Sequence, residues 1–144
     1  MSESSIQITL RQQQDYQFDV DFGDRIAVLQ ADEPAPLGSG QGPSPLQLLA
    51  AAVGNCLSDS LLFALRKFKQ APEPLHCTIT AEVGRNPEKR LRVLKMTAVL
   101  RLGVPASALK HLDRVLDQFE AYCTVTQSVG QGIPIELQVI DSEG

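Results

Sequence analysis

Three cysteines, Cys56, Cys77 and Cys123, are the residues of this chain best suited to do chemistry. A thiolate can attack the O–O bond of a peroxide and become a sulfenic acid, and a second thiol then condenses with that acid to form a disulfide. This chemistry needs one accessible, acidic cysteine and one resolving partner, without a metal or a histidine. We predict no metal site, because no two cysteines form a C-x-x-C pair and His76 and His111 fall in different expected elements.

Cys56 lies in the segment "AAAVGNCLSDSLL", residues 50–62, where an apolar run turns polar. Ser44 and Gln47 form an S-x-x-Q capping box, and a proline fits the first helical position, so a helix should run from residue 45 to about Lys69. Its first two-thirds are apolar on nearly all sides. We therefore expect a central helix that is covered on most of its surface.

Alternating apolar and polar residues predict strands around this helix. Residues 6–10, 16–22 and 25–30 should form an antiparallel meander, followed by a long Pro- and Gly-rich loop over residues 31–45. Loops of this length are often functional or contact a partner. Further strands are expected at 75–83, 90–102 and 131–140. In the second of these the inner face should comprise Leu94, Met96, Ala98, Leu100 and Leu102.

A second helix is expected from about residue 105 to Cys123, which falls at the end of its apolar stripe. If the two helices pack together, the sulfurs of Cys56 and Cys123, 67 residues apart, can meet in a pocket. Cys77 fits an alternating strand as a core residue, although it remains an alternative resolving partner. Asp59 follows Cys56 by one turn and would raise the pKa of its thiol, so a cation from elsewhere in the fold would be needed to form the thiolate.

The element order is thus β-β-β-α-β-β-α-β, which predicts one α+β domain over residues 1–144, with two central helices packed on an antiparallel sheet. The net charge of −4, without a long basic run, argues against nucleic acid as a partner. The longest apolar run, residues 46–53, is too short for a membrane span, and no signal peptide opens the chain. A cytoplasmic protein with reduced thiols is therefore expected.

Two segments carry a resemblance to a known family. Residues 42–67, "GPSPLQLLAAAVGNCLSDSLLFALRK", resemble the central helix of the OsmC/Ohr family of osmotically inducible and organic hydroperoxide resistance proteins. Residues 120–137, "EAYCTVTQSVGQGIPIEL", look like the family's second-cysteine segment.

The resemblance implies an intertwined homodimer with two active sites at the subunit interface. It also implies a cofactor-independent, cysteine-based peroxidase of the oxidative stress response, whose chemistry is like that of peroxiredoxins. Cys56 would be the peroxidatic thiol and Cys123 the resolving one. The substrates would be organic hydroperoxides, and the reductant a dithiol, which is a lipoyl-protein in the best-known branch.

One departure from the family's pattern stands at the start of the central helix. Well-studied members carry a glutamate there that holds an arginine over the peroxidatic sulfur, whereas here Pro45 is followed by Leu46 and Gln47. Gln47 can hydrogen-bond without a charge, and its capping role alone also explains it. Arg11 is the nearest match for the arginine and Arg25 the next, although both also fit surface positions. The missing glutamate leaves open a non-catalytic protein that binds an apolar small molecule in the interface pocket.

Overall fold

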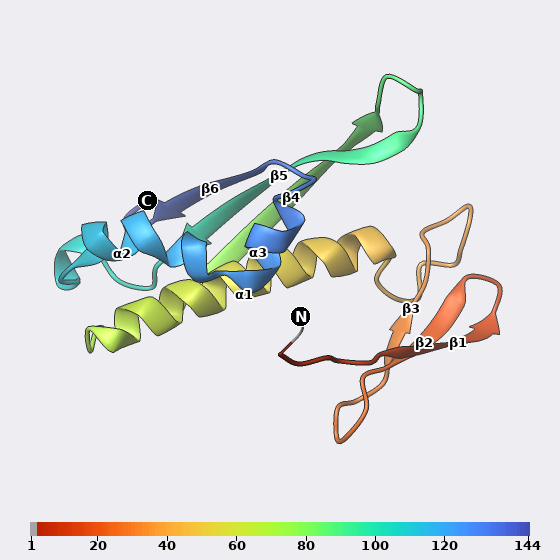
Figure 1. Ribbon diagram of the computed structural model, residues 1–144, viewed down its shortest axis with the longest axis horizontal. Coiled ribbons are helices and arrows are strands. Elements are labelled where there is room, and N and C mark those ends of the chain that lie inside the picture. Colours follow the sequence, from red (N-terminus) through yellow and green to blue (C-terminus); the bar gives the residue numbers. More distant parts are fainter. Residues whose placement is uncertain (1–2) are drawn as a thin grey trace. The chain divides into compact units, whose positions relative to one another are not determined.

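Three short strands belong to the first of two units into which the described residues, 3–144, of this computed structural model divide. β1 (Thr9–Gln14), β2 (Gln17–Asp21) and β3 (Leu29–Ala31) pair antiparallel in the order β1-β2-β3. Figure 1 shows this meander in red and orange. The predicted antiparallel order is confirmed, but the first and third strands begin later in the chain than the predicted 6–10 and 25–30. The first unit ends at Leu49, and the second covers residues Ala50–Gly144.

The loop that follows β3 is organised by one buried carboxylate. Asp32 is only 2% exposed. Its side chain accepts hydrogen bonds from the backbone N–H groups of Glu33 at 2.7 Å, Ser39 at 3.3 Å and Gln41 at 3.0 Å. The N–H of Asp32 itself donates to the carbonyl oxygen of Pro43 at 3.1 Å. A single side chain thus closes this loop by satisfying backbone donors that would otherwise need water.

Replacing this carboxylate by an amide, Asp32→Asn, should loosen the loop, because an amide has one oxygen for the donors that two oxygens now serve. Limited proteolysis at neutral pH should cut residues 33–43 faster than in the wild type. The matched variant Glu33→Gln changes the neighbouring acid in the same way and should be cut at the wild-type rate. Equal cutting of the two variants would show that Asp32 does not hold the loop.

The same carboxylate gives the loop a pH dependence with a defined sign. The N–H of Gln41, with smaller contributions from Glu33 and Ser39, holds the pKa of Asp32 below its usual 3.8 despite its burial. The stability from this carboxylate is therefore fully present above pH 3.8 and is lost as the pH falls through the lowered folded-state pKa. The acid side of the unfolding curve should be flatter in Asp32→Asn than in the wild type.

α1 (Pro45–Lys67) is the long helix predicted around Cys56. Its capping box is confirmed, since the Gln47 N–H donates to Ser44 Oγ at 3.2 Å and the Ser44 N–H donates to Gln47 Oε1 at 2.9 Å. The buried residues of the helix follow helical spacing; they are Val53, Gly54, Leu57, Leu61 and Leu65. This stripe forms one side of the core of the second unit.

The rest of α1 departs from what the sequence predicts. A helix covered on most of its surface was expected, but in the most apolar 18-residue window of α1 only 28% of the residues are buried. Among residues 3–144, α1 is also the one helix whose length and composition would allow it to cross a membrane. This was not predicted from the sequence, because only the longest uninterrupted apolar run was considered. A core helix meets the same test, and α1 buries its leucine stripe within this chain.

The second unit is built on the sheet β4 (His76–Arg85), β5 (Leu91–Arg101) and β6 (Ile135–Ile140), in that order. β4 and β5 are antiparallel, as expected. β6 runs parallel to β5, so the prediction of a purely antiparallel sheet is wrong in this detail. The reason is the connection, because the chain crosses over through helical segments before it enters β6. Figure 1 shows these segments on the same side of the sheet as α1.

The predicted inner face of β5 is confirmed except at its first position. Met96, Ala98, Leu100 and Leu102 are buried, whereas Leu94 is 46% exposed. The β4–β5 register shifts between Glu82 and Val83, which takes Leu94 out of the regular alternation.

The second predicted helix is instead a series of short segments: η1 (Ala106–Ala108), α2 (Leu112–Gln118), η2 (Phe119–Tyr122) and α3 (Thr124–Val129). Cys123 has an extended backbone, with φ −83° and ψ 96°, so it lies at the break between η2 and α3. α3 was not predicted, because its β-branched residues are typical of a strand. The break gives the Cys123 side chain a direction that a continuous helix would not give it.

Candidate active site

The side chains of Cys56 and Cys123 lie close enough for each thiol to shift the pKa of the other. Cys56 lies on α1 and is half-buried, whereas Cys123 is fully buried at the break before α3. The structure therefore brings together the two thiols that the sequence singled out. Of these two residues, Cys56 is the one that is partly exposed to solvent.

Polar groups from two elements surround the Cys123 sulfur. Its thiol donates a hydrogen bond to Thr126 Oγ1 at 2.9 Å, and Thr126 is itself buried. The backbone N–H of Thr126 and the side chain of Ser60, from α1, lie near enough to lower the pKa of this thiol. Burial alone would raise the pKa of the Cys123 thiol, but hydrogen bonds from Cys56, Thr126 and Ser60 together lower it.

The pKa of the Cys56 thiol is shifted in the opposite direction, upward. Burial, and after it the contact with Cys123, raises its pKa. The backbone N–H groups of Val125 and Thr126 face the Cys56 sulfur and partly oppose this effect. Because each thiol shifts the pKa of the other, the two titrate as a pair.

Cys77 occupies a different place. It lies on β4, half-buried, and contacts the Ser58 side chain of α1. A Cβ added at Gly54 would lie 3.3 Å from the Cys77 sulfur. Positions 54 and 58 lie on the side of the helix opposite position 56. Burial raises the pKa of the Cys77 thiol, which fits the core role that the sequence predicted.

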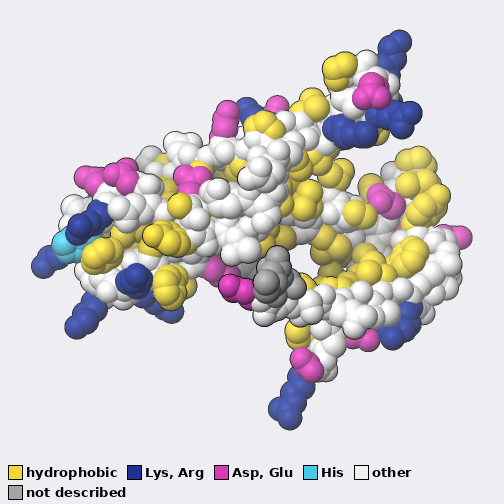
Figure 2. Space-filling model, viewed as in Figure 1, with side chains coloured by type: hydrophobic (Ala, Val, Ile, Leu, Met, Phe, Trp, Pro, Cys, Tyr) yellow, Lys and Arg dark blue, Asp and Glu magenta, His cyan; other side chains and the backbone are white. Residues whose placement is uncertain are grey.

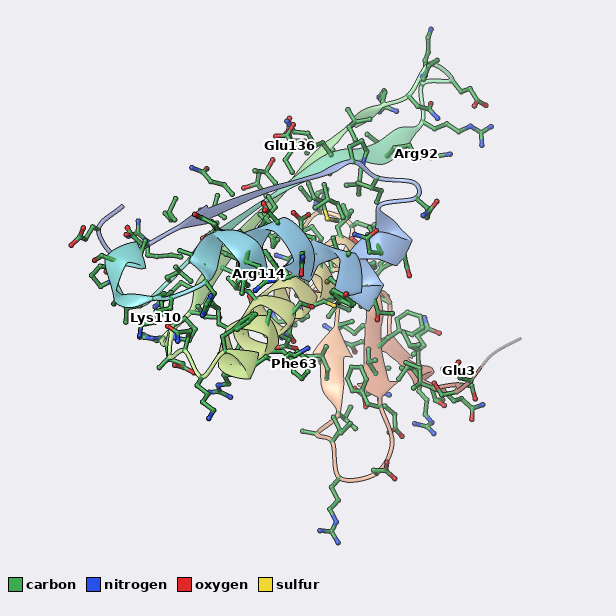
Figure 3. All side chains as sticks on the ribbon, turned by 60° about the vertical axis from the view of Figure 1, so that its left-hand side comes forward. Glu3, Phe63, Arg92, Lys110, Arg114 and Glu136 are labelled. Atoms are coloured by element: carbon green, nitrogen blue, oxygen red, sulfur yellow. The ribbon has the colours of Figure 1, made fainter. Side chains whose placement is uncertain are left out.

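A groove of about 430 Å³ lies between α1 and the α2–η2 segment. Its walls comprise Asp59, Ser60, Phe63, Ala64, Lys67, Phe68, Arg114, Val115, Gln118, Phe119 and Tyr122. Figure 3 labels Phe63 and Arg114, which contribute to it from the two sides. Ser60 lines the groove and also lowers the pKa of the Cys123 thiol, so this wall of the groove is near the thiol pair.

The groove was not predicted from the sequence, although one of its two walls could have been recognised from the residue spacing in α1. Residues 56, 60, 63 and 67 follow one face of α1 at i, i+4, i+7 and i+11, so they continue the face that carries Cys56. The other wall comes from a segment whose breaks could not be predicted. Among residues 3–144, no cluster of three or more His, Cys, Asp or Glu side chains could hold a metal ion.

Comparison with known families agrees with the fold. Residues 38–138 match the family described as OsmC-like protein. This chain belongs to the OsmC-like protein family. The matched residues include both Cys56 and Cys123 and cross the boundary between the two units.

Solved structures share the OsmC fold over nearly the whole chain. An OsmC-like protein of unknown function from Vibrio cholerae is 18% identical, with a TM-score of 0.76 and coverage of 97% of this chain and 100% of the other. An organic hydroperoxide resistance protein OsmC from Legionella pneumophila is 15% identical (TM-score 0.73, coverage 97% and 99%). The organic hydroperoxide resistance protein OhrB of Bacillus subtilis is 14% identical (TM-score 0.71, coverage 96% and 99%). A search of curated proteins gave no significant match.

The residues considered as supports of the thiol lie in the first unit of this OsmC-like chain. The Gln47 side-chain oxygen accepts the capping-box hydrogen bond from the Ser44 N–H. Arg11 forms an ion pair with Asp21 at 3.1 Å, and its side chain is 61% exposed. Arg25 is exposed between β2 and β3. Gln47 and Arg11 thus have local partners, and their roles toward Cys56 remain predictions.

Proposed function

We propose that this OsmC-like protein is a thiol-dependent peroxidase that reduces organic hydroperoxides through Cys56 and Cys123. The observation that supports the proposal is that the partly exposed Cys56 and the fully buried Cys123 lie close enough to shift each other's pKa. In the first step, the Cys56 sulfur attacks the terminal peroxide oxygen, the O–O bond breaks, and the alcohol leaves. In the second step, the Cys123 sulfur displaces hydroxide from the Cys56 sulfenic acid, and a disulfide forms.

We propose that the active protein is a homodimer. Large apolar side chains are exposed in both units, namely Ile6, Leu10, Ile26, Val28, Leu37, Val83, Leu91 and Leu94. Exposed apolar surface on this scale is typical of an interface.

The distribution of charge also supports a second copy of this chain as the partner. Residues 1–49 carry seven acidic and two basic side chains, whereas residues 85–92, at the tip of the β4–β5 hairpin, carry four basic and one acidic. Figure 2 shows basic and hydrophobic side chains together at that tip. A second copy therefore offers an acidic unit that complements the basic hairpin.

The cycle also requires a reductant and a reducing compartment. We propose a dithiol protein of the lipoyl type as the reductant, because the proposed product is a disulfide that another dithiol can reopen by exchange. We place the protein in the cytoplasm, where free thiols such as these stay reduced.

Thiol titration tests the peroxidase directly. One equivalent of cumene hydroperoxide should remove two thiols per wild-type chain, and peptide mapping should find a Cys56–Cys123 disulfide. In Cys123→Ser, Cys56 should stop as sulfenic or sulfinic acid, seen by intact mass as one or two added oxygens. The control Cys77→Ser should behave as wild type. A disulfide within the Cys123→Ser chain would instead identify Cys77 as the resolving thiol.

A second candidate function is non-catalytic binding of an apolar small molecule. The groove beside the thiols favours it, since Phe63, Phe119 and Tyr122 are among its walls. A wild-type chain that keeps all three thiols after peroxide treatment would favour binding over catalysis.

A further inference from the structure

We propose that the groove between α1 and the α2–η2 segment holds an unbranched apolar chain with a negatively charged end, and that Lys67 and Arg114 determine this specificity. The inference rests on the proposed peroxidase function and narrows its substrates to hydroperoxides that carry a carboxylate far from the peroxide. Neutral hydroperoxides of the same length are expected to be poorer substrates.

One end of the groove lies beside the two thiols. Ser60, one turn after Cys56 on α1, is among the walls, and so is Tyr122, the residue before Cys123. From Ser60 the wall continues along α1 to Lys67. At a rise of 1.5 Å per residue, these two positions are about 10 Å apart. With C–C bonds of about 1.5 Å, an extended chain of about nine carbons spans that distance.

Two cations meet at the other end of the groove. The ring centroids of Phe68 and His111 are 4.9 Å apart, which places the end of α1 beside the start of α2. Lys67 and Arg114, from these two helices, both line the groove and are exposed. Within residues 3–144 neither forms an ion pair, whereas the neighbouring Arg66 does. Both cations are therefore available to an anion in the groove.

The distribution of charge along the groove fixes the direction of the chain. Asp59, at the end beside the thiols, is an acidic wall residue, and its carboxylate accepts a hydrogen bond from the Asn55 side chain at 3.2 Å. The acidic residues of α2, Asp113 and Asp117, are not among the walls. A ligand carboxylate is therefore repelled from the thiol end and attracted to the cationic end. The opposite end of the chain is then presented to Cys56.

The space between the two ends suits a hydrocarbon chain. The walls there are Phe63 and Ala64 of α1 and Val115 and Phe119 of the α2–η2 segment. Val115 and Phe119 are buried, whereas Phe63 is exposed, so a bound chain would remove the Phe63 ring from water. Apolar walls with a few charged groups at defined places are typical of sites that bind small molecules.

Calorimetric titration without peroxide tests the site. The reduced wild type should bind nonanoate about tenfold more tightly than nonan-1-ol, which has the same chain length and no charge. Lys67→Met and Arg114→Gln should each weaken nonanoate binding about threefold, and the double variant should bind both ligands alike. Lys110→Met is the matched control and should bind as the wild type does, because Lys110 is an exposed cation beside the start of α2 that does not line the groove. Equal affinities, or no binding of either ligand, in the wild type would overturn the proposal.

A second measurement connects the site with the peroxidase. The ω-hydroperoxide of nonanoic acid and its methyl ester differ only in the charge at the far end. The second-order rate of disulfide formation should favour the acid about tenfold in the wild type, and the two rates should become equal in the double variant. A preference for the acid that survived in the double variant would refute the role of the two cations. Failure of the peroxidase proposal looks different, since no disulfide would then form with either hydroperoxide while the calorimetric preference for nonanoate could still be measured.

Discussion

Replacing Cys56 by serine should abolish the reaction of the protein with organic hydroperoxides. A serine hydroxyl does not ionise at neutral pH and does not attack a peroxide, and the remaining sulfur of the pair is fully buried. Consumption of cumene hydroperoxide by Cys56→Ser should therefore equal that of buffer alone. Intact mass should show Cys77 and Cys123 still reduced, without an added oxygen.

The control is Cys77→Ser, which should consume hydroperoxide at the wild-type rate, because Cys77 faces the opposite side of α1. If Cys56→Ser kept its activity, another thiol would be the attacking one. Comparing Cys56→Ser with the double variant lacking both Cys56 and Cys77 would then identify it. Activity that survived in the double variant would make Cys123 the peroxidatic thiol and would require the buried site to open.

The parts of this fold that were predicted from the sequence depend on local interactions. The start of α1 follows from Ser44 and Gln47, whose side chains satisfy backbone groups only three residues away. The strands follow from alternation, which fixes which residues share a face. The placement of Cys56 and Cys123 side by side followed from their expected faces and from the family resemblance.

The missed features depend on contacts between distant segments. The parallel direction of β6 is decided by the crossover through residues 103–134, which no local pattern encodes. The break at Cys123 separates two short helical segments. Because the break was not predicted from the sequence, the hydrogen bond between Cys123 and Thr126 was not predicted either. Ser60 appeared in the sequence only as part of a polar turn of the helix. Its closeness to Cys123, 63 residues later in the chain, comes from the packing of distant segments.

The close approach of α1 to β4 leads to the largest stability effect that we expect. Gly54 is buried on α1, and a Cβ added there would lie 2.6 Å from Cγ1 of Ile79, with the sulfur of Cys77 and Cδ1 of Ile79 at 3.3 Å. Contacts at 2.6 Å require the neighbour to move. Gly54→Leu adds four carbons to this space, so the free energy of unfolding should fall by about 3 kcal/mol or more.

The variant Gly54→Ala tests two effects that oppose each other, the higher helix propensity of alanine and the overpacking of the core. Alanine favours the helix by about 1 kcal/mol over glycine, whereas overpacking of a core costs about 1–3 kcal/mol. We therefore expect a smaller net loss than in Gly54→Leu, with Ile79 moving to accommodate one methyl group. Urea denaturation followed by circular dichroism measures both variants, and the leucine variant should lower the midpoint by about 1 M or more.

Gly132→Leu is the matched control, because a Cβ added at Gly132 meets nothing within 4 Å. The same substitution there should change the free energy of unfolding by less than about 0.5 kcal/mol. If Gly54→Leu unfolded at the wild-type midpoint, α1 could not approach β4 as closely as the structure has it. Since Cys56 is carried by the same helix, its position relative to Cys123 would then also be in error, and this stability measurement therefore tests the basis of the proposed chemistry.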